Sequence, residues 1–534
     1  MIMDGRDNER FAAYIQLICE LESRLCDRAS SIRKRQTGIE GLSTENMGAR
    51  FPSSSFQYSR ALNDETIYPI GDEKLMESIL PLFDGAVCPG SDMFLLNIHP
   101  NPDVLAAAVA CLSMYHNIDG LMDEYAGTAL LYEQKIAREI GSWAGWQYAS
   151  GVSTSGGKGT VSYALRAAFA KSYPDYLKKG VPDKTVIIAS EGAHYSLAHT
   201  VSILGLGVDN CLLVPMGDDF SMDCFQLSNT LNLAWGKGYT VAAVVCCGGS
   251  TINFHCDDLT KVFRTICKVR EQYPNAAIPH LHVDAVIGWQ YLALTEKFVF
   301  CSDVSDITKQ KISEIQRRLL GVKHFDSFGA DFHKNGYCPT SSSFYIEKSG
   351  SFMTNLTIGE HIGEVLNASL GQHRPYKYTV ENSRNIGGVF SAWTILAKYG
   401  RSGLAKALLE FYVTMENFSL AFAQSELFSK YTTKTLGWEV IFEINESVFE
   451  NFHISKTTRD FVDYCKELTF VGYATPLIGY VKENDKMLIF PNGLVSIDKA
   501  KEIVRLLEVC LQEYCQSCEL QDGRPFSSVD DPVQ

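Results

Sequence analysis

The sequence predicts an α/β protein with a mainly parallel central sheet covered by helices. Short apolar, β-branched runs are expected as buried strands, and they lie at 185–189, 211–215, 241–246 and 280–286. Helical patterns separate several of these runs, at 161–172, 223–235 and 258–273. Alternation of strands and helices is typical of parallel sheets, because a parallel crossover usually contains a helix.

The patterns on either side of this region predict further helices, a linker and a second domain. Apolar residues recur at three- and four-residue steps in 1–35, which predicts an amphipathic helix, and a polar linker follows at 36–60. Helices are also expected at 103–116 and 129–141, and a long one begins near Gly387 before a smaller α+β region. We therefore expect an N-terminal helical dimerisation segment, a large domain and a small C-terminal domain, at 1–110, 111–385 and 386–534.

Composition limits the function classes. The 534 residues carry 48 basic and 62 acidic side chains, a net charge of −14, which argues against nucleic-acid binding. The most apolar runs, such as 241–249, are about half as long as the ~20 residues that a membrane-spanning helix needs. Residues 1–10 carry charges of both signs and lack the apolar stretch of a signal peptide, so we expect a cytoplasmic protein.

The cysteine pattern gives no sign of a metal site. Sixteen cysteines are scattered along the chain, several of them in apolar segments. Cys515 and Cys518 form a C-x-x-C pair, but no second pair or histidine stands at zinc-site spacing. We expect buried thiols in a reducing compartment instead.

A glycine-rich turn leads into one of the expected helices. It reads T-S-G-G-K-G-T over 154–160 and contains Gly156, Gly157 and Lys158. Free backbone N–H groups at a helix N-terminus attract anions, which suits a phosphate. The segment lacks the G-K-S/T ending of a P-loop, and an ordinary glycine-rich turn is the alternative.

Three polar residues stand where open α/β sheets bind ligands, near the carboxyl ends of strands. His194 follows the strand at 185–189, Asp284 lies at the end of the 280–286 run, and Lys334 follows a segment of small residues. Each has a structural alternative, namely a hydrogen-bonded histidine, a strand-end salt bridge and a surface lysine. Together with the glycine turn, however, they provide what pyridoxal 5'-phosphate requires: a phosphate cradle, a stacking ring, a partner for the ring nitrogen and a Schiff-base lysine.

The motifs T-S-G-G, E-G-A-H-Y-S, H-V-D-A and D-S-F-G-A-D-F-H-K, in this order, resemble the group II pyridoxal-phosphate-dependent amino-acid decarboxylases. This family includes glutamate, aromatic amino-acid and bacterial tyrosine decarboxylases. Further similarity lies in Asn97-Ile98-His99-Pro100, Glu133 and Arg384, and the segment 334–339 is most similar to the bacterial tyrosine decarboxylase branch. The resemblance covers about residues 94–405.

The resemblance implies a type I aminotransferase-like fold and a homodimer that converts an L-amino acid to its amine and carbon dioxide. It implies that Ser250 or Thr251, together with His333, helps to hold the phosphate. It also implies a tyrosine, on a loop after the lysine, that protonates the product. The candidates for this proton donor are Tyr376 and Tyr378.

Some positions depart from the family pattern. Lys158 begins K-G-T-V where T-E-A-N is usual, Trp289 puts bulk near the expected ring, and Phe332 replaces a proline. The substrate therefore stays open between an aromatic amino acid such as tyrosine and glutamate. Another pyridoxal-phosphate lyase, an oxidative aldehyde-forming enzyme and an inactive paralogue are the alternatives.

Overall fold

The computed structural model describes residues 5–36, 59, 62, 71–86, 91, 93–300, 302–359, 371–431, 435–451, 458–470, 475–482 and 484–520. The chain forms two compact units, one comprising 1–97, 414–432 and 440–534 and the other 98–413 and 433–439. The predicted linker lies almost wholly outside the described residues. The predicted boundaries of the three segments stay predictions.

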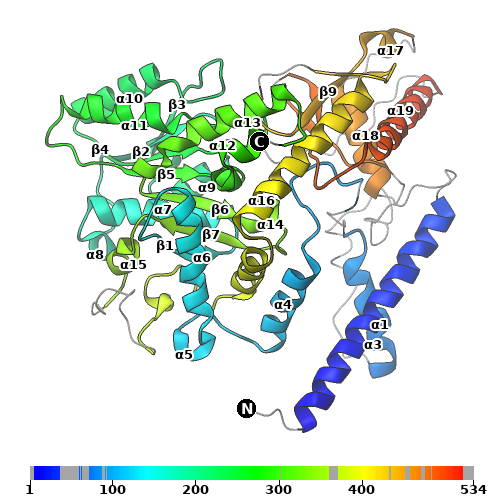
Figure 1. Cartoon of the computed structure of the whole chain (residues 1–534), viewed down its shortest axis with the longest axis horizontal. Helices are drawn as coiled ribbons and strands as arrows, with labels where there is room; N and C mark the ends of the chain where they lie inside the picture. Colours follow the sequence, from blue (N-terminus) through cyan, green and yellow to red (C-terminus); the bar gives the residue numbers. More distant parts are fainter. Residues whose placement is uncertain are drawn as a thin grey trace. The chain divides into compact units, whose positions relative to one another are not determined.

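The larger unit contains a seven-stranded sheet in the order β1-β7-β6-β5-β4-β2-β3 (Figure 1). Its strands are β1 (Ser150–Thr154), β2 (Thr185–Ser190), β3 (Cys211–Val214), β4 (Thr240–Cys247), β5 (His280–Asp284), β6 (Ser327–Asp331) and β7 (Ser343–Glu347). Neighbours from β6 to β3 pair in parallel, whereas β7 runs antiparallel to both β1 and β6. The predicted mainly parallel sheet is confirmed.

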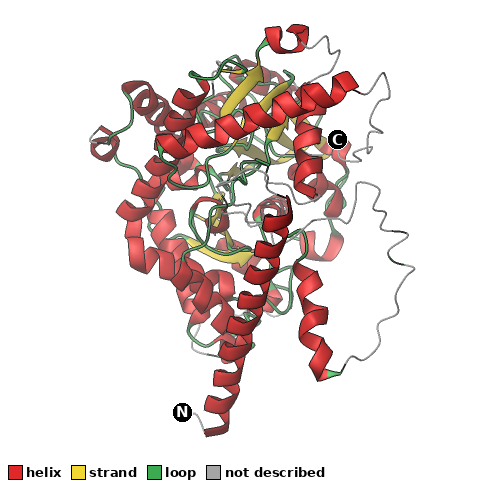
Figure 2. Ribbon diagram, turned by 90° about the vertical axis from the view of Figure 1, so that its right-hand side faces the viewer, coloured by secondary structure: helices red, strands yellow, loops and turns green. Residues whose placement is uncertain are grey.

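Helices flank these strands (Figure 2). They are α4 (Val104–Tyr115), α5 (Asp123–Ala126), α6 (Ala129–Trp143), α7 (Gly157–Ser172), α8 (Tyr176–Lys179), α9 (Ser196–Ile203), α10 (Cys224–Gly236), α11 (Leu259–Arg270), α12 (Glu296–Phe300), α13 (Asp306–Leu319), α14 (Phe332–Asn335) and α15 (Ser351–Asn355). The start of α4 follows from local chemistry, because the Asp103 carboxylate accepts hydrogen bonds from the N–H groups of Leu105 and Ala106. The helix predicted at 161–172 begins four residues earlier, at Gly157.

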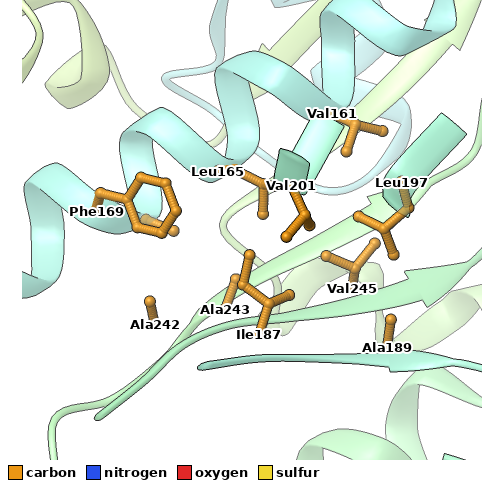
Figure 3. Close-up of a cluster of buried hydrophobic side chains, with 11 residues drawn as sticks. Val161, Leu165, Phe169, Ile187, Ala189, Leu197, Val201, Ala242, Ala243 and Val245 are labelled. Carbon is orange, nitrogen blue, oxygen red and sulfur yellow. The ribbon is translucent and has the colours of Figure 1, made fainter. Parts of the chain in front are cut away.

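Helix α7 is fixed on the sheet by a buried apolar cluster (Figure 3). Its residues Val161, Leu165 and Phe169 recur at four-residue steps and pack with Ile187 of β2 and Val245 of β4. Burying each such side chain contributes about 1.5–3 kcal/mol. This packing holds the glycine-rich N-terminus of α7 beside the carboxyl ends of the strands.

A buried ion pair ties α6 to the segment after η6 (Pro375–Lys377). Arg384 Nη1 donates to Glu133 Oε1 at 2.9 Å, and the Ser153 N–H donates to the same oxygen at 2.8 Å. Burial opposes the charge of Glu133, but Arg384 outweighs burial and lowers the pKa of the carboxyl. Both residues belong to the segments that resemble the family, and their ion pair gives them a structural role.

Replacing Arg384 by methionine is therefore expected to lower the free energy of unfolding by about 3–5 kcal/mol, because Glu133 would be left buried without a counter-charge. Urea denaturation measures this loss. The double variant Glu133→Gln/Arg384→Met is the control, and it should recover much of the stability. A loss below about 1 kcal/mol in the single variant would contradict the buried ion pair.

The smaller unit contains a four-stranded antiparallel sheet in the order β10-β11-β9-β8. Its strands are β8 (Phe428–Lys430), β9 (Val440–Ile444), β10 (Gly479–Val481) and β11 (Lys486–Ile489), and its helices are α1 (Gly5–Gln36), α3 (Asp72–Ile79), α17 (Glu446–Asn451), α18 (Thr458–Phe470) and α19 (Ile497–Leu520). The long helix α16 (Gly387–Phe422) contains the boundary between the units and a non-helical residue, Gly400. No helix in the described ranges is both long and apolar enough to cross a membrane.

Candidate active site

The predicted site residues gather at one edge of the large sheet. Asp284 ends β5, His194 follows β2, and Lys334 lies in α14 directly after β6. Since β1, β2, β4, β5 and β6 share one direction, their carboxyl ends meet at this edge. Parallel topology thus brings together side chains that are far apart in sequence.

Lys334 presents its amine next to a second carboxylate. Its side chain is 22% exposed, and Nζ lies 3.3 Å from Oδ2 of Asp331, the last residue of β6. The Asp331 side chain is 1% exposed. Lys334 is therefore a half-buried amine in a charged site and not a solvated surface lysine.

Asp284 offers an unsatisfied acceptor. Its Oδ1 atom is buried and has no hydrogen-bond donor among the described residues. Burial raises the pKa of the carboxyl to about 6, while the charge of Lys334 opposes this shift. The charged carboxylate is therefore incompletely compensated by the protein, and a ligand N–H group would provide the missing partner.

His194 is held in one orientation. Its Nδ1 atom accepts a hydrogen bond from the N–H of Ser196 at 3.2 Å and lies 2.8 Å from the hydroxyl of the same residue. Burial and the charge of Lys334 lower the pKa of His194, so the ring is neutral at pH 7. Because Nδ1 is an acceptor, the proton of the neutral ring is on Nε2.

The glycine turn opens α7 as predicted. Gly156 has a φ of 136°, a conformation that favours glycine, and Gly157 is the first helical residue. A Cβ atom on Gly157 would lie 3.1 Å from Val286 Cγ1 and 3.2 Å from Asp331 Oδ2. Lys158 is exposed, and its charge acts on His194. The absence of side chains leaves the first N–H groups of α7 open to an anion.

A buried amide connects the lysine helix to the turn after β5. Asn335 donates to the Ile287 carbonyl at 2.7 Å and accepts from Trp289 Nε1 at 2.9 Å. The Trp289 indole is fully buried, with its ring centroid 4.5 Å from that of Phe332. Two of the three residues that depart from the family pattern, Trp289 and Phe332, therefore pack against each other at the start of α14.

The remaining phosphate candidates lie in two places. The Ser250 hydroxyl donates to the Ile252 carbonyl at 2.6 Å and accepts from the His255 N–H at 2.9 Å, so it closes its own loop, which also holds Thr251. His333 Nε2 lies 3.8 Å from Asp331 Oδ2. Their contact with a phosphate stays a prediction.

The two candidate proton donors differ in environment. Tyr378 is 1% exposed in a core cluster, and its hydroxyl lies 3.0 Å from His373 Nε2. Its pKa is raised by burial and by Glu133. Tyr376 is half-buried in η6. Among the described residues, no hydrogen bond links Tyr378 to Lys334, and both catalytic roles stay predictions.

Two further residues belong to the site. The sequence motifs assigned no role to Asp331. Its position three residues before Lys334, at the end of a strand, could have indicated that it belongs to the site. His99 also lies nearby, because its ring centroid is 6.3 Å from that of His333. Burial, His333 and Lys334 lower the pKa of His99.

These residues fit pyridoxal phosphate. The Asp284 oxygen without a donor suits a protonated ring nitrogen, the start of α7 suits a phosphate, and Lys334 supplies an amine.

A family model described as the pyridoxal-dependent decarboxylase conserved domain matches residues 110–305. Residues 110–305 are therefore similar to the conserved domain of this family. A glutamate decarboxylase of Drosophila melanogaster, one of the curated relatives, is 25% identical over 40% of this chain and 41% of the relative.

A cysteine sulfinic acid decarboxylase of Rattus norvegicus is 24% identical over 49% of this chain and 48% of the relative. The aligned region thus spans less than half of these curated relatives. Solved structures share the fold over nearly the whole chain. The crystal structure of mouse CSAD has a TM-score of 0.74 at 18% identity, and the match covers 94% of this chain and 99% of that chain. Oryza sativa TDC with PLP and tryptamine has a TM-score of 0.70 at 14% identity, with 96% and 99% covered. The predicted type I aminotransferase-like, pyridoxal-phosphate fold is confirmed.

Proposed function

We propose that this protein is a pyridoxal-phosphate-dependent decarboxylase of an L-amino acid. The observation that carries the proposal is the buried Asp284 oxygen, which has no donor in the described part of the chain, in the same site as the Lys334 amine. The bound cofactor supplies an electron sink for the pair left on Cα when a bond to that carbon breaks.

Each side chain of the site would have a different role toward this cofactor. Lys334 would hold the cofactor through its amine, and the amino group of the substrate would take the place of that amine. Asp284 would keep a proton on the ring nitrogen, because the protein compensates its buried charge only in part. The first N–H groups of α7 and Lys158 would hold the phosphate, together with His333, whose Nε2 lies 3.8 Å from Asp331 Oδ2. His194 is neutral and fixed by Ser196, so it can lie against the ring.

The substrate class is an amino acid with an acidic or aromatic side chain. Glutamate and cysteine sulfinate decarboxylases are among the curated relatives, and a TDC bound to tryptamine shares the fold. His99 and His333 provide nitrogen atoms near Lys334 that suit a carboxylate or sulfinate. Tyrosine stays a candidate through the similarity of the segment 334–339.

The test is an amino-acid panel with purified enzyme and pyridoxal phosphate, containing glutamate, aspartate, cysteine sulfinate, tyrosine and tryptophan. Release of carbon dioxide together with the matching amine supports the proposal. The second candidate, an aldehyde-forming reaction, is favoured by the position of Tyr378, one possible proton donor, which lies in a core cluster with its hydroxyl 3.0 Å from His373 Nε2. It predicts aldehyde, ammonia and hydrogen peroxide, with consumption of oxygen, in place of the amine. No turnover of any amino acid by cofactor-loaded protein would favour an inactive paralogue.

We further propose a homodimer that uses α1. Three large apolar residues of this helix are 43–49% exposed on the single chain: Ile15 and Ile18, which lie three residues apart on one face, and Leu17, which lies on another. Exposed apolar residues gathered on one element often mark a surface that a partner covers. Light scattering at micromolar concentration should give a dimer, and deletion of residues 1–36 should shift it toward the monomer. The triple variant Ile15→Ser/Leu17→Ser/Ile18→Ser should do the same, and a full-length monomer with complete activity would contradict this role.

A further inference from the structure

A buried carboxylate lies against the predicted phosphate cradle. Asp331 is 1% exposed, and neither of its carboxylate oxygens has a hydrogen-bond donor in the described part of the chain. A Cβ atom on Gly157 would lie 3.2 Å from Oδ2 and 3.6 Å from Oδ1. The carboxylate therefore faces the first turn of α7, where an anion would bind.

The charges around Asp331 come from several elements. Lys334 Nζ lies 3.3 Å and His333 Nε2 lies 3.8 Å from Oδ2, both from α14. Asp284 of β5 and His194 after β2 also interact electrostatically with Asp331. Asp284 adds a second acidic group and His194 is neutral at pH 7, so the basic group closest to Asp331 is the amine of Lys334.

A phosphate ester bound at the first turn of α7 would carry a negative charge beside the negative charge of Asp331. Its second pKa is about 6, so it is mostly a dianion at pH 8. A buried carboxylate and a phosphate dianion in contact repel each other strongly, because the interior screens charge poorly. The repulsion is relieved when a single proton lies between a carboxylate oxygen and a phosphate oxygen, since that proton converts the contact into a hydrogen bond.

We propose that Asp331 makes phosphate binding at the start of α7 proton-linked, so that the site takes up one proton together with the phosphate group of its cofactor. The inference rests on the proposed function for the identity of that cofactor. Asp331 then acts as a specificity residue, which favours a phosphate monoester able to carry the proton over a permanently divalent or sulfonated anion.

The test uses cofactor-free wild-type enzyme and two probes that cannot bond covalently to Lys334, pyridoxamine phosphate and pyridoxamine. Calorimetric titration at pH 8, in buffers of different ionisation enthalpy, counts the protons taken up on binding. We expect the enzyme to take up about one more proton when it binds pyridoxamine phosphate than when it binds pyridoxamine. The dissociation constant of pyridoxamine phosphate should then rise with pH by an additional factor of about ten per pH unit compared with that of pyridoxamine. Equal proton uptake by the two probes would overturn the inference, and this result needs no variant.

The variant Asp331→Asn keeps the shape and supplies an N–H donor. It should abolish the extra proton uptake and tighten pyridoxamine phosphate binding at pH 8 by about tenfold to a hundredfold, since that pH is about two units above the phosphate pKa. Binding of pyridoxamine should change far less, which controls for altered ion pairing with Lys334. Weaker binding of the phosphorylated probe to a folded variant would overturn the inference. Failure of both probes to bind wild-type enzyme would instead overturn the proposed cofactor, and the inference with it.

Discussion

Replacing Lys334 by alanine is expected to reduce turnover by about 10³-fold or more, because the variant loses both the covalent anchor and an amine that moves protons. In the wild type, borohydride should fix pyridoxal phosphate to the peptide that contains Lys334. The variant should show no such labelling while retaining its fold.

Lys179 provides a matched control, since it is a 75% exposed lysine on α8 that pairs with Asp175. Lys179→Ala should leave labelling and turnover unchanged. Peptide mapping after borohydride treatment decides the assignment, and labelling of another lysine in wild-type enzyme would show that Lys334 is not the anchor.

Replacing Asp284 by asparagine is expected to reduce turnover by about 10²–10³-fold, because the variant keeps the shape of the site but loses the charge that holds a proton on the ring nitrogen. Cofactor content should fall much less. Single-turnover rates on cofactor-loaded protein measure the effect. A loaded variant with the wild-type rate would show that Asp284 is not the partner of the ring nitrogen.

The stability of the cofactor-free variant gives an independent readout. Burial raises the pKa of Asp284 from 3.8 to about 6, so ionisation of this carboxyl costs folding free energy. For a carboxyl with a raised pKa, the cost is absent below the unfolded value and complete above the folded one. Asp284→Asn should therefore gain stability relative to wild type as the pH rises from about 4 to 6, and should keep that gain at higher pH.

Asp257 is the matched control for this measurement. Burial also raises the pKa of its carboxyl to about 6, but it accepts hydrogen bonds from the N–H groups of Met222 and Cys247, both at 2.7 Å. Asp257→Asn should be destabilised by about 1–3 kcal/mol, since one buried donor is left without an acceptor. If the two variants lost equal stability, Asp284 would be a structural carboxylate like Asp257.

The local pattern of the sequence determined the elements that carry the site. Strand-like runs at 185–189 and 241–246 became β2 and β4, as expected for strands of a parallel sheet, which are buried on both faces and therefore read as continuous apolar runs. His194 and Asp284 were recognisable because they lie near the ends of such runs, where parallel topology directs ligands. The glycine turn was recognisable because it precedes an expected helix, and Lys334 because it completes the family motif.

Tertiary structure decided what each side chain contacts. The sequence does not show that Asp331 reaches both Gly157 and Lys334, nor that the Ser250 hydroxyl closes its own loop. It did not distinguish Tyr378, which is buried in a core cluster, from a tyrosine on a loop. The physical reason is that periodicity reports which face of an element is apolar, whereas hydrogen bonds and electrostatic shifts depend on distances between residues that are far apart in the chain.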